Sequence, residues 1–261
     1  METVDTADKM IRDHVGVVIL AAGLGTRMKS DRAKVLHPLN GTPMICYVAE
    51  TAKSLNVAET IFVIGHQADQ VRMAVEPSDR IKFAHQTRQL GTGHAVKCAM
   101  PELSPQIEHV MILCGDVPLL RPATANRLMN DHLRAGRDVT VVAVEALDPT
   151  GYGRIVMDSE RQVCAIVEEA DASESQKEIR IVNAGIYCVN RLFLDKALEK
   201  LETGNAQGEF YLTDIVSIAR RKNRLVGVVL ADDPDEVAGI NTSAELQAAE
   251  KVLFGRNDKT A

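Results

Sequence analysis

A buried strand that runs directly into a glycine-rich turn is the feature that most constrains this chain. Residues 17–20 are four consecutive apolar residues, and the turn Ala21-Ala22-Gly23-Leu24-Gly25 follows them. An uninterrupted apolar run rich in β-branched residues is typical of a parallel strand covered on both faces. A turn of small residues lets backbone N–H groups approach an anion, and its two glycines tolerate positive φ. The sequence therefore predicts a polyphosphate site at the end of this strand.

Two basic side chains close to the turn favour the same interpretation. Arg27 offers a planar fork for bidentate contact with phosphate oxygens, and Lys34 adds a movable point charge. The alternative is an ordinary strand-to-helix turn with solvated basic residues, because short glycine motifs also occur by chance. The agreement of strand, glycines and cations favours phosphate binding.

Two better-known glycine motifs are excluded. A dinucleotide fingerprint requires a third glycine where Met28 stands, and the next apolar strand, residues 61–64, is not followed by an acid for a ribose hydroxyl. A P-loop requires Gly-Lys-Ser or Gly-Lys-Thr, which this turn lacks. The predicted phosphate site is therefore of a different kind.

The composition excludes several classes of partner. The 261 residues carry a formal net charge of −6, with no Trp and 3% aromatic residues. Nucleic-acid-binding proteins favour a broad basic face and aromatic stacking platforms, so we expect no nucleic-acid partner. Residues 1–14 form a polar N-terminal extension without the apolar core of a secretion signal, and no apolar run reaches about 18 residues. We expect a cytoplasmic protein with no membrane partner.

The cysteines are expected to be small buried thiols. Their number is odd, their spacing is wide and no Cys-x-x-Cys pair occurs, which disfavours a metal site or a disulfide framework. They are Cys46, Cys98, Cys114, Cys164 and Cys188.

The first half of the chain alternates apolar strands with amphipathic helices. Strands are expected at residues 61–64, 110–113 and 139–144, and helices at residues 43–55, about 69–75, 95–99 and 123–135. Thr42 would cap the first of these helices, with Pro43 at its first position. This alternation predicts an α/β fold with a Rossmann-like doubly wound, mostly parallel sheet.

The pattern changes after residue 148. Strand-like segments at residues 162–167 and 182–189 lack long crossover helices, which predicts a small β-rich second lobe. A helix at residues 191–201, a helix ending at residue 222 and capped by Thr213 or Asp214, and a strand at residues 225–230 would follow. Thr242-Ser243-Ala244-Glu245 is a capping-box pattern for a final helix.

An acid follows the strand at residues 110–113. Asp116 would lie at the carboxyl end of a parallel strand, where α/β sheets bind their ligands, and a carboxylate there suits a hard cation that bridges to phosphates. Alternatively, Asp116 caps the turn before Pro118. Asn241 is not needed by the capping box next to it, so its amide oxygen is free for other contacts.

Further polar residues could contact a ligand. The segment Gln86 to Ala95 places a second pair of glycines at the start of a helix, which is either a ligand contact or an ordinary loop. Glu168 and Asn183 interrupt apolar strands, so they are either structural hydrogen-bonding groups or contacts for a polyol.

Six segments in chain order, between about residue 15 and residue 252, together resemble one known family. They are Leu20 to Met28, Lys34 to His37, Gln89 to His94, Gly115 to Pro118, Pro149 to Ile155 and Gly208 to Asp214. They resemble the uridyltransferase (pyrophosphorylase) half of the bacterial bifunctional N-acetylglucosamine-1-phosphate uridyltransferase/glucosamine-1-phosphate acetyltransferase family. Six motifs in order are far more specific than the glycine turn alone.

The resemblance implies a fold of the nucleotide-diphospho-sugar transferase type. Residues 15–254 would form the nucleotidyltransferase domain, with a sugar-binding lobe at about 148–212 and a polar tail at 255–261. The implied partners are UTP, N-acetylglucosamine 1-phosphate and Mg²⁺, and the implied products are UDP-N-acetylglucosamine and pyrophosphate. The attack on the α-phosphorus would be in line and would need no nucleophilic side chain, so the absence of a Ser-His-Asp signature is expected.

The resemblance also implies a role for individual residues. Arg27 and Lys34 would neutralise phosphates, and Asp116 and Asn241 would hold Mg²⁺. The residues implied in nucleotide binding are Leu20, Ala21, Ala22, Gly23, Gln86, Gly91 and Thr92, and those implied in sugar binding are Gly153, Glu168 and Asn183.

The sequence departs from the family at several points. Cys114 stands where an aromatic residue is common and Ala184 where Thr is usual, and both positions bear on sugar choice. The bifunctional members continue into a β-helix of hexapeptide repeats that builds a trimer. Such repeats are absent here, so the sequence does not support acetyl transfer. Because that trimer is built by the β-helix, the oligomeric state is left open.

Two other functions remain as alternatives. The chain could be an enzyme for another sugar 1-phosphate or for a molybdopterin-type acceptor. It could instead be a non-catalytic sensor of sugar nucleotides, which would be expected to lack phosphate- or metal-binding residues. Arg27, Lys34, Asp116 and Asn241 are all present.

Overall fold

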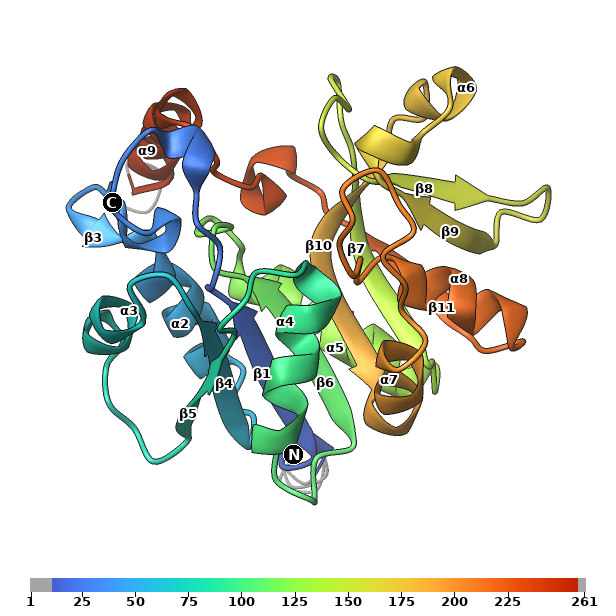
Figure 1. Cartoon of the computed structure of the whole chain (residues 1–261), viewed down its shortest axis with the longest axis horizontal. Helices are drawn as coiled ribbons and strands as arrows, with labels where there is room; N and C mark the ends of the chain where they lie inside the picture. Colours follow the sequence, from blue (N-terminus) through green and yellow to red (C-terminus); the bar gives the residue numbers. More distant parts are fainter. Residues whose placement is uncertain (1–10, 258–261) are drawn as a thin grey trace.

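The computed structural model describes residues 11–257, which are built around one nine-stranded mixed sheet (Figure 1). Its main path is, in spatial order, β11 (Val226–Leu230), β7 (Val139–Glu145), β10 (Ile181–Asn190), β6 (His109–Cys114), β1 (Val15–Leu20), β4 (Glu59–Ile64) and β5 (Ile81–His85). Only β10 is antiparallel to its neighbours in this path. The predicted mostly parallel α/β sheet is confirmed. Most of the predicted N-terminal extension, residues 1–10, and residues 258–261 of the predicted tail lie outside the described residues.

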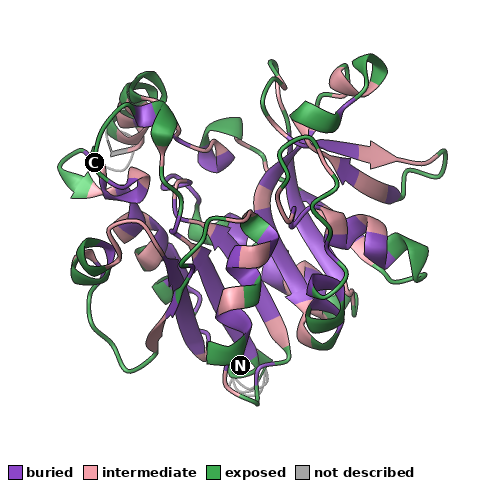
Figure 2. Cartoon of the chain, viewed as in Figure 1, coloured by how far each residue is buried: buried purple, intermediate pink, exposed green. Residues whose placement is uncertain are grey.

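Helices cover both faces of the sheet. One face packs against α2 (Met44–Ser54), α3 (Ala68–Ala74) and α5 (Pro122–Arg134), and the other against α4 (Thr92–Ala99), α7 (Arg191–Leu198) and α8 (Asp214–Arg221). In β1, Val17 and Ile19 face the first group of helices and Val18 faces the second, and all three are fully buried. Figure 2 shows the same burial along the central strands. Burial on both faces explains the uninterrupted apolar run.

The register of the three central strands places their carboxyl ends level with one another. Leu20 at the end of β1 is paired with Val63 in β4 and with Cys114 in β6. The loops that follow these strands therefore meet at one edge of the sheet, which is where parallel α/β sheets bind ligands.

The part of the chain after residue 148 is arranged differently from the prediction. β8 (Arg154–Met157) and β9 (Val163–Val167) form a hairpin beside β10, and α6 (Glu174–Lys177) lies close to it (Figure 1). β10 itself lies between β6 and β7, so the assignment of the strand at residues 182–189 to a second lobe is wrong. An antiparallel strand needs no crossover helix, which is why its connections resembled those of a separate lobe. The lobe boundaries at about 148 and 212 stay a prediction.

The first predicted helix cap is also wrong. Thr42 and Pro43 form strand β3 (Thr42–Pro43), which pairs with β2 (Pro38–Leu39), and α2 begins one residue later at Met44. Pro43 is the N-cap of α2 and no side chain caps this helix. Pairing within the β2–β3 hairpin holds Thr42 in an extended conformation, which overrides its preference as a cap.

The final helix begins as predicted. The N–H of Glu245 donates to Thr242 Oγ1 at 3.2 Å, and the N–H of Thr242 donates to Glu245 Oε2 at 2.8 Å, which completes the capping box. This helix, α9 (Ser243–Asn257), continues into the segment predicted as a polar tail. Short 3₁₀ turns occur at Thr26–Met28, Lys34–Leu36, Met100–Glu102, Glu169–Asp171 and Pro234–Val237. No helix among residues 11–257 is long and apolar enough to cross a bilayer.

Candidate active site

A cleft of about 370 Å³ lies at the carboxyl edge of the sheet. It is lined by Leu20, Ala21, Ala22, Gly23, Leu24, Gly25, Thr26, Lys34, Val35, Gln86, Gln89, Gly91, Thr92, Ala95, Cys114, Asp116 and Glu209. Every residue predicted to bind the nucleotide is in this set, together with Lys34 and Asp116. The structure therefore brings together segments that are separated by up to about 190 positions in the sequence.

The glycine turn presents unpaired backbone donors to the cleft. The N–H of Ala21 continues the sheet by donating to the carbonyl of Val63 at 2.9 Å. Within the described part of the chain, the N–H groups of residues 22–25 donate to no acceptor. Unpaired amides grouped in a turn are suited to an anion with several oxygens.

Of the two glycines expected to tolerate positive φ, one adopts it and the other does not. Gly25 has φ +66°, and a Cβ atom there would lie 2.6 Å from Lys34 Cβ. Gly25 is therefore required for the turn to approach Lys34. Gly23 does not have positive φ, and a Cβ atom there would meet nothing within 4 Å. The absence of a side chain at Gly23 leaves open space at the cleft.

The predicted phosphate and metal residues meet in one cluster. Lys34 Nζ pairs with Asp116 Oδ2 and donates to Asn241 Oδ1 at 2.9 Å. Arg27 Nη2 donates to the same Asn241 oxygen at 2.8 Å. The side chains of Lys34 and Asp116 are only 17% and 19% exposed, so their charges are less screened by water than charges at the surface.

A buried carboxylate fastens the segment that carries Asn241. Glu236 is 1% exposed, and it accepts hydrogen bonds from Thr124 Oγ1 at 2.9 Å and from the N–H of Arg121 at 3.4 Å. These groups belong to the first turn of α5, where the helix dipole favours a negative charge. At its other end, the segment is held by the N–H of Ile240, which donates to the Asp116 carbonyl at 2.9 Å.

The cluster has donors that fit Mg²⁺. Asp116 and Asn241 supply a carboxylate and an amide oxygen, and the Lys34 ammonium bridges the two, which shows that one positive group can contact both oxygens. Among residues 11–257 there is no group of three or more His, Cys, Asp or Glu side chains arranged for a metal. Magnesium is commonly held by one or two protein oxygens together with phosphates and water, so this small donor set is appropriate for it.

The second pair of glycines is held by a segment far along the chain. Gly91 has φ +104°, and a Cβ atom there would lie 2.6 Å from the Phe210 carbonyl oxygen. The N–H of Phe210 donates to the Leu90 carbonyl, and the N–H of Gly93 donates to the Phe210 carbonyl, both at 2.8 Å. The helix after this turn, α4, begins at Thr92 and not at Ala95 as expected. The segment around Phe210 thus shapes the cleft wall.

Gln86 lies beside this turn and lines the same cleft. It is 4% exposed, and its Nε2 donates to the Gly91 carbonyl at 3.1 Å and lies 3.1 Å from His94 Nδ1. Burial is the main cause that lowers the pKa of His94. Both contacts involve the nitrogen of the amide, which leaves Gln86 Oε1 as an acceptor for a ligand.

Glu209 and Gln89 are among the lining residues to which the sequence analysis assigned no individual role. Glu209 comes from the segment Gly208 to Asp214, and Gln89 follows Gln86 by three positions. Both belong to segments already singled out for their resemblance, but nothing in their local pattern separates a cleft residue from its neighbours. The contact between the two segments is visible only in the folded chain.

The predicted sugar-binding residues also lie together. The N–H of Asn183 donates to the Gly153 carbonyl at 2.8 Å, and a Cβ atom at Gly153 would lie 3.3 Å from Glu168 Oε2. Thr213 is the N-cap of α8, but its hydroxyl donates to Glu168 Oε1 at 3.0 Å instead of capping the helix. Burial raises the pKa of Glu168. Asn183 Nδ2 donates to Tyr187 Oη at 2.8 Å.

The predicted sugar-binding residues are not among the residues that line the cleft at the carboxyl edge of the sheet. Glu168 lines a separate cavity of about 340 Å³ that also contains Asp171 and Tyr211. Cys114 connects the two regions, because it lines the nucleotide cleft and its Sγ donates to the Gly185 carbonyl at 3.2 Å, next to the predicted sugar residue Asn183. Burial raises the pKa of the Cys114 thiol to about 12.

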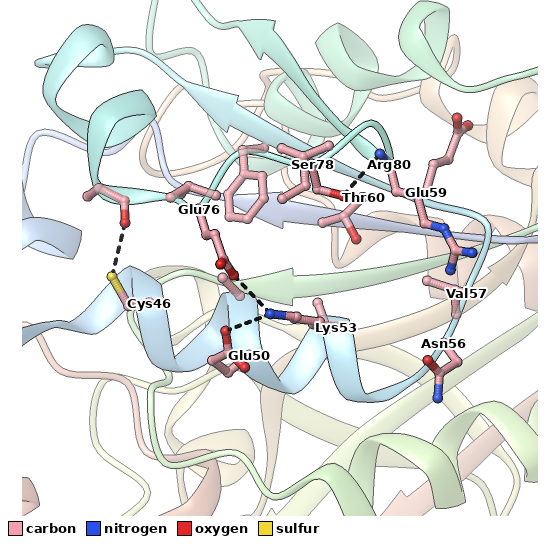
Figure 3. A pocket seen from close by; sticks show the side chains of 16 residues that line it. Cys46, Glu50, Lys53, Asn56, Val57, Glu59, Thr60, Glu76, Ser78 and Arg80 are labelled. Atoms are coloured by element: carbon pink, nitrogen blue, oxygen red, sulfur yellow. Dashed lines mark hydrogen bonds and ion pairs between the residues drawn. The ribbon is translucent and has the colours of Figure 1, made fainter.

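A further cavity, of about 440 Å³, lies between α2, the start of β4 and residues 74–81 (Figure 3). Lys53 Nζ lies 2.9 Å from Glu76 Oε2 and 3.7 Å from Glu50 Oε1 at its edge. Glu59, at the amino end of β4, is one of its lining residues, whereas ligands of parallel α/β sheets bind at the carboxyl ends. It shares no lining residue with the nucleotide cleft, so it is not part of the candidate site.

The chain is similar to characterised families over most of its length. The family described as "MobA-like NTP transferase domain" matches residues 17–182. Proteins named "Bifunctional protein GlmU" are among its relatives. The one from Heliobacterium modesticaldum is 48% identical over 239 residues, which cover 92% of this chain and 52% of that protein. The one from Desulfotalea psychrophila is 44% identical over 245 residues, which cover 94% of this chain and 72% of that protein.

The chain spans about half the length of most of the curated relatives reported for it. Among solved structures, a UDP-glucose pyrophosphorylase complexed with UDP-glucose has a TM-score of 0.72 at 16% identity, covering 92% of this chain and 98% of that one. A putative glucose-1-phosphate thymidylyltransferase from Bacillus anthracis has a TM-score of 0.69 at 17% identity, covering 91% and 94%. These two likenesses support the shared fold.

Proposed function

Because this chain belongs to the family of MobA-like NTP transferase domains and corresponds to the nucleotidyltransferase part of GlmU proteins, we propose that it transfers a uridylyl group from UTP to N-acetylglucosamine 1-phosphate. The products would be UDP-N-acetylglucosamine and pyrophosphate. The names of the two structural neighbours refer to glucose compounds, but those proteins are only 16% and 17% identical to this chain. The GlmU relatives are much more similar, so we base the choice of substrates on them.

One observation carries the proposal. Arg27, Lys34, Asp116 and Asn241 come from four separate segments, yet their side chains form one hydrogen-bonded cluster at a cleft lined by unpaired backbone amides. Two cations, one carboxylate and a row of amide donors are what a triphosphate with a divalent cation needs. A sensor without catalytic activity would not need this complete set.

The reaction requires charge neutralisation more than proton transfer. A non-bridging oxygen of the sugar phosphate attacks the α-phosphorus, the bond from this phosphorus to the β-phosphate oxygen breaks, and pyrophosphate leaves with that oxygen. The attacking phosphate is already ionised at neutral pH, so no strong general base is needed. Arg27 would stabilise the leaving pyrophosphate, and Lys34 would turn from Asp116 to a phosphate oxygen.

Asp116 and Asn241 would hold Mg²⁺, which supplies positive charge that offsets repulsion between the two phosphate groups. The chain's own part in this step is to keep the two oxygens adjacent. The hydrogen bond from Ile240 to the Asp116 carbonyl and the buried contact of Glu236 with α5 do this.

The same arrangement suggests how the two organic groups are bound. Gln86 Oε1 is free to accept the N–H of a uracil ring, and Gly91 leaves room for that ring beside Thr92. Gly153, Glu168 and Asn183 would bind the amino sugar, with Glu168 accepting from its hydroxyl groups and Thr213 holding the carboxylate in place.

The test is pyrophosphate release by the purified chain supplied with Mg²⁺, UTP and N-acetylglucosamine 1-phosphate. A panel that replaces UTP with dTTP or CTP, and the acceptor with glucose 1-phosphate or glucosamine 1-phosphate, measures specificity. We expect Arg27→Ala to lower turnover by about 10²-fold or more while the protein stays folded.

Exposed Arg161, which lies outside the cleft lining, provides the matched control, and Arg161→Ala should retain wild-type turnover. Release only with another nucleotide and sugar phosphate would replace the proposed substrates. Absence of release with every pair, together with tight binding of UDP-sugars, would favour a sensor.

A further inference from the structure

One side chain fastens the loop that brings Lys34 to the cleft. Gln67 Nε2 donates to the carbonyl of Asp31 at 2.8 Å, and Gln67 Oε1 accepts the N–H of Ala33 at 2.8 Å. One of these backbone groups is an acceptor and the other is a donor. A side-chain amide can therefore hydrogen-bond to both, whereas a carboxylate or an amine can hydrogen-bond to only one. Both bonds fall within the three residues that precede Lys34.

The backbone of Gln67 has an unfavourable conformation for this residue type. Its φ of 52° and ψ of 41° are left-handed, which costs a non-glycine residue about 1–2 kcal/mol. Gln67 is the N-cap of α3, but its side chain makes no capping hydrogen bond. Glycine would suit this turn better, so the amide contacts with residues 31–33 are what the glutamine adds. Strain of this kind is most often kept where it serves a function.

The turn that contains Gln67 lies next to the cleft without lining it. It follows β4 at the carboxyl edge of the sheet, where a Cβ atom at Gly65 would lie 3.0 Å from the Ala22 carbonyl oxygen (β4 and α3 are labelled in Figure 1). Gln67 is not among the cleft-lining residues, so it does not touch a ligand bound there. Its contacts reach the cleft only through residues 31–33 and Lys34.

The loop has few other attachments to the rest of the chain. Residues 29–32 are exposed, and Ala33 is fully buried. Besides Gln67, His66 Nε2 lies 3.3 Å from the Asp31 carbonyl oxygen. Among the described residues, the loop also has one internal bond, from the N–H of Arg32 to Ser30 Oγ, and the His37 ring hydrogen-bonds to the backbone of Arg32.

We propose that Gln67 is a positioning residue for Lys34. Its hydrogen bonds to Asp31 and Ala33 hold the backbone of the loop in one position. In that position the Lys34 ammonium lies between Asp116 and Asn241, within reach of a bound phosphate. This inference rests on the phosphate-binding part of the proposed function and is independent of which nucleotide and sugar are used.

The test separates positioning from folding. Gln67→Gly removes both hydrogen bonds and also removes the left-handed strain, so the melting temperature should stay the same or rise. Binding of inorganic pyrophosphate with Mg²⁺, measured by calorimetry, should weaken about tenfold, because two hydrogen bonds that order the loop are lost. Gln70→Ala, at an exposed glutamine in α3, is the matched control and should bind pyrophosphate as the wild type does.

A double-mutant cycle shows whether Gln67 acts through Lys34. In a Lys34→Met background, Gln67→Gly should cause no further loss of pyrophosphate affinity. Equal losses in both backgrounds, or unchanged affinity in the single variant, would overturn the proposal. Gln67→Asn, which tolerates the left-handed backbone but is one methylene shorter, should repeat the loss if the glycine variant does not fold.

The outcome is distinguishable from a failure of the proposed function. Pyrophosphate binding that weakens as expected, in a protein that does not use UTP and N-acetylglucosamine 1-phosphate, would refute the substrates and retain the role of Gln67. A wild-type protein that binds no pyrophosphate would overturn the inference as well.

Discussion

Buried His132, which lies beside the half-buried His109, should make the protein lose stability in mild acid. His132 is fully buried at the core side of α5, with Nε2 3.0 Å from His109 Nδ1 and Nδ1 2.9 Å from Thr140 Oγ1. Burial, followed by the nearby His109 and Arg137, lowers the pKa of His132 from 6.5 to about 3. Burial also lowers the pKa of His109. His132 is therefore neutral in the folded protein at neutral pH and in mild acid.

The size of the effect follows from the difference between folded and unfolded pKa. Because the folded pKa is the lower one, His132 does not lower the free energy of unfolding above about pH 6.5. Below that pH, it lowers the free energy of unfolding more and more as the pH falls toward about 3. Each unit of pKa difference corresponds to 1.36 kcal/mol, so the cost is about 2 kcal/mol at pH 5 and about 5 kcal/mol at its limit. About 2 kcal/mol is a large share of the stability of a typical domain.

The measurement is urea unfolding of the wild type and of His132→Asn at about pH 7 and about pH 5. The variant removes one hydrogen-bonding ring and should be less stable at both pH values. Its stability should nevertheless fall less between them, by about 2 kcal/mol, than that of the wild type. His85→Asn, at an exposed histidine that ends β5, is the control and should follow the wild type. Equal falls for the wild type and His132→Asn would refute the buried neutral imidazole.

Three further predictions concern the cleft and the separate cavity that contains Glu168. Asp116→Asn should lower pyrophosphate release by about 10²-fold or more in a protein that still folds, and near-normal release would remove Asp116 from the metal site. Gly25→Ala should lower the unfolding free energy by about 1–3 kcal/mol, because its Cβ would lie 2.6 Å from Lys34 Cβ. Gly23→Ala should leave the unfolding free energy unchanged and weaken nucleotide binding. Equal unfolding free energies for the two variants would contradict the packing argument. Glu168→Gln should raise KM for the sugar phosphate about tenfold with little change in KM for UTP, which steady-state kinetics with each substrate varied can check.

Features that depend on local pattern were predicted correctly from the sequence. The apolar run before the glycine turn identified a strand buried on both faces, since each of its residues must face one helical layer or the other. Asp116 was expected at the ligand edge because it follows a strand, and pairing of β1 with β6 places it there. The capping box of Thr242 and Glu245 lies within four residues and formed as expected.

Features that depend on contacts between distant segments were not predictable from such patterns. Thr42 has the chemistry of a cap but is held in a short hairpin with Leu39. Glu209 looks like a surface acid until the packing of Phe210 on Gly91 brings it to the cleft. Gln67 ends a strand-to-helix turn, and only the folded chain shows that its amide holds the loop before Lys34.

The charges of the cluster are consistent with binding of the two anionic substrates proposed for this acidic protein. The chain carries a net charge of −6, yet Lys34 hydrogen-bonds to the oxygens of Asp116 and Asn241, and Arg27 hydrogen-bonds to Asn241. In this arrangement Lys34 and Asp116 neutralise each other, so the cluster is stable without a ligand. A divalent cation on Asp116 would leave Lys34 without its carboxylate partner, and a phosphate would then be its best replacement. Binding of the cation and of the triphosphate should therefore support each other, and this mutual support depends on the loops that hold Lys34 and Asn241 in place.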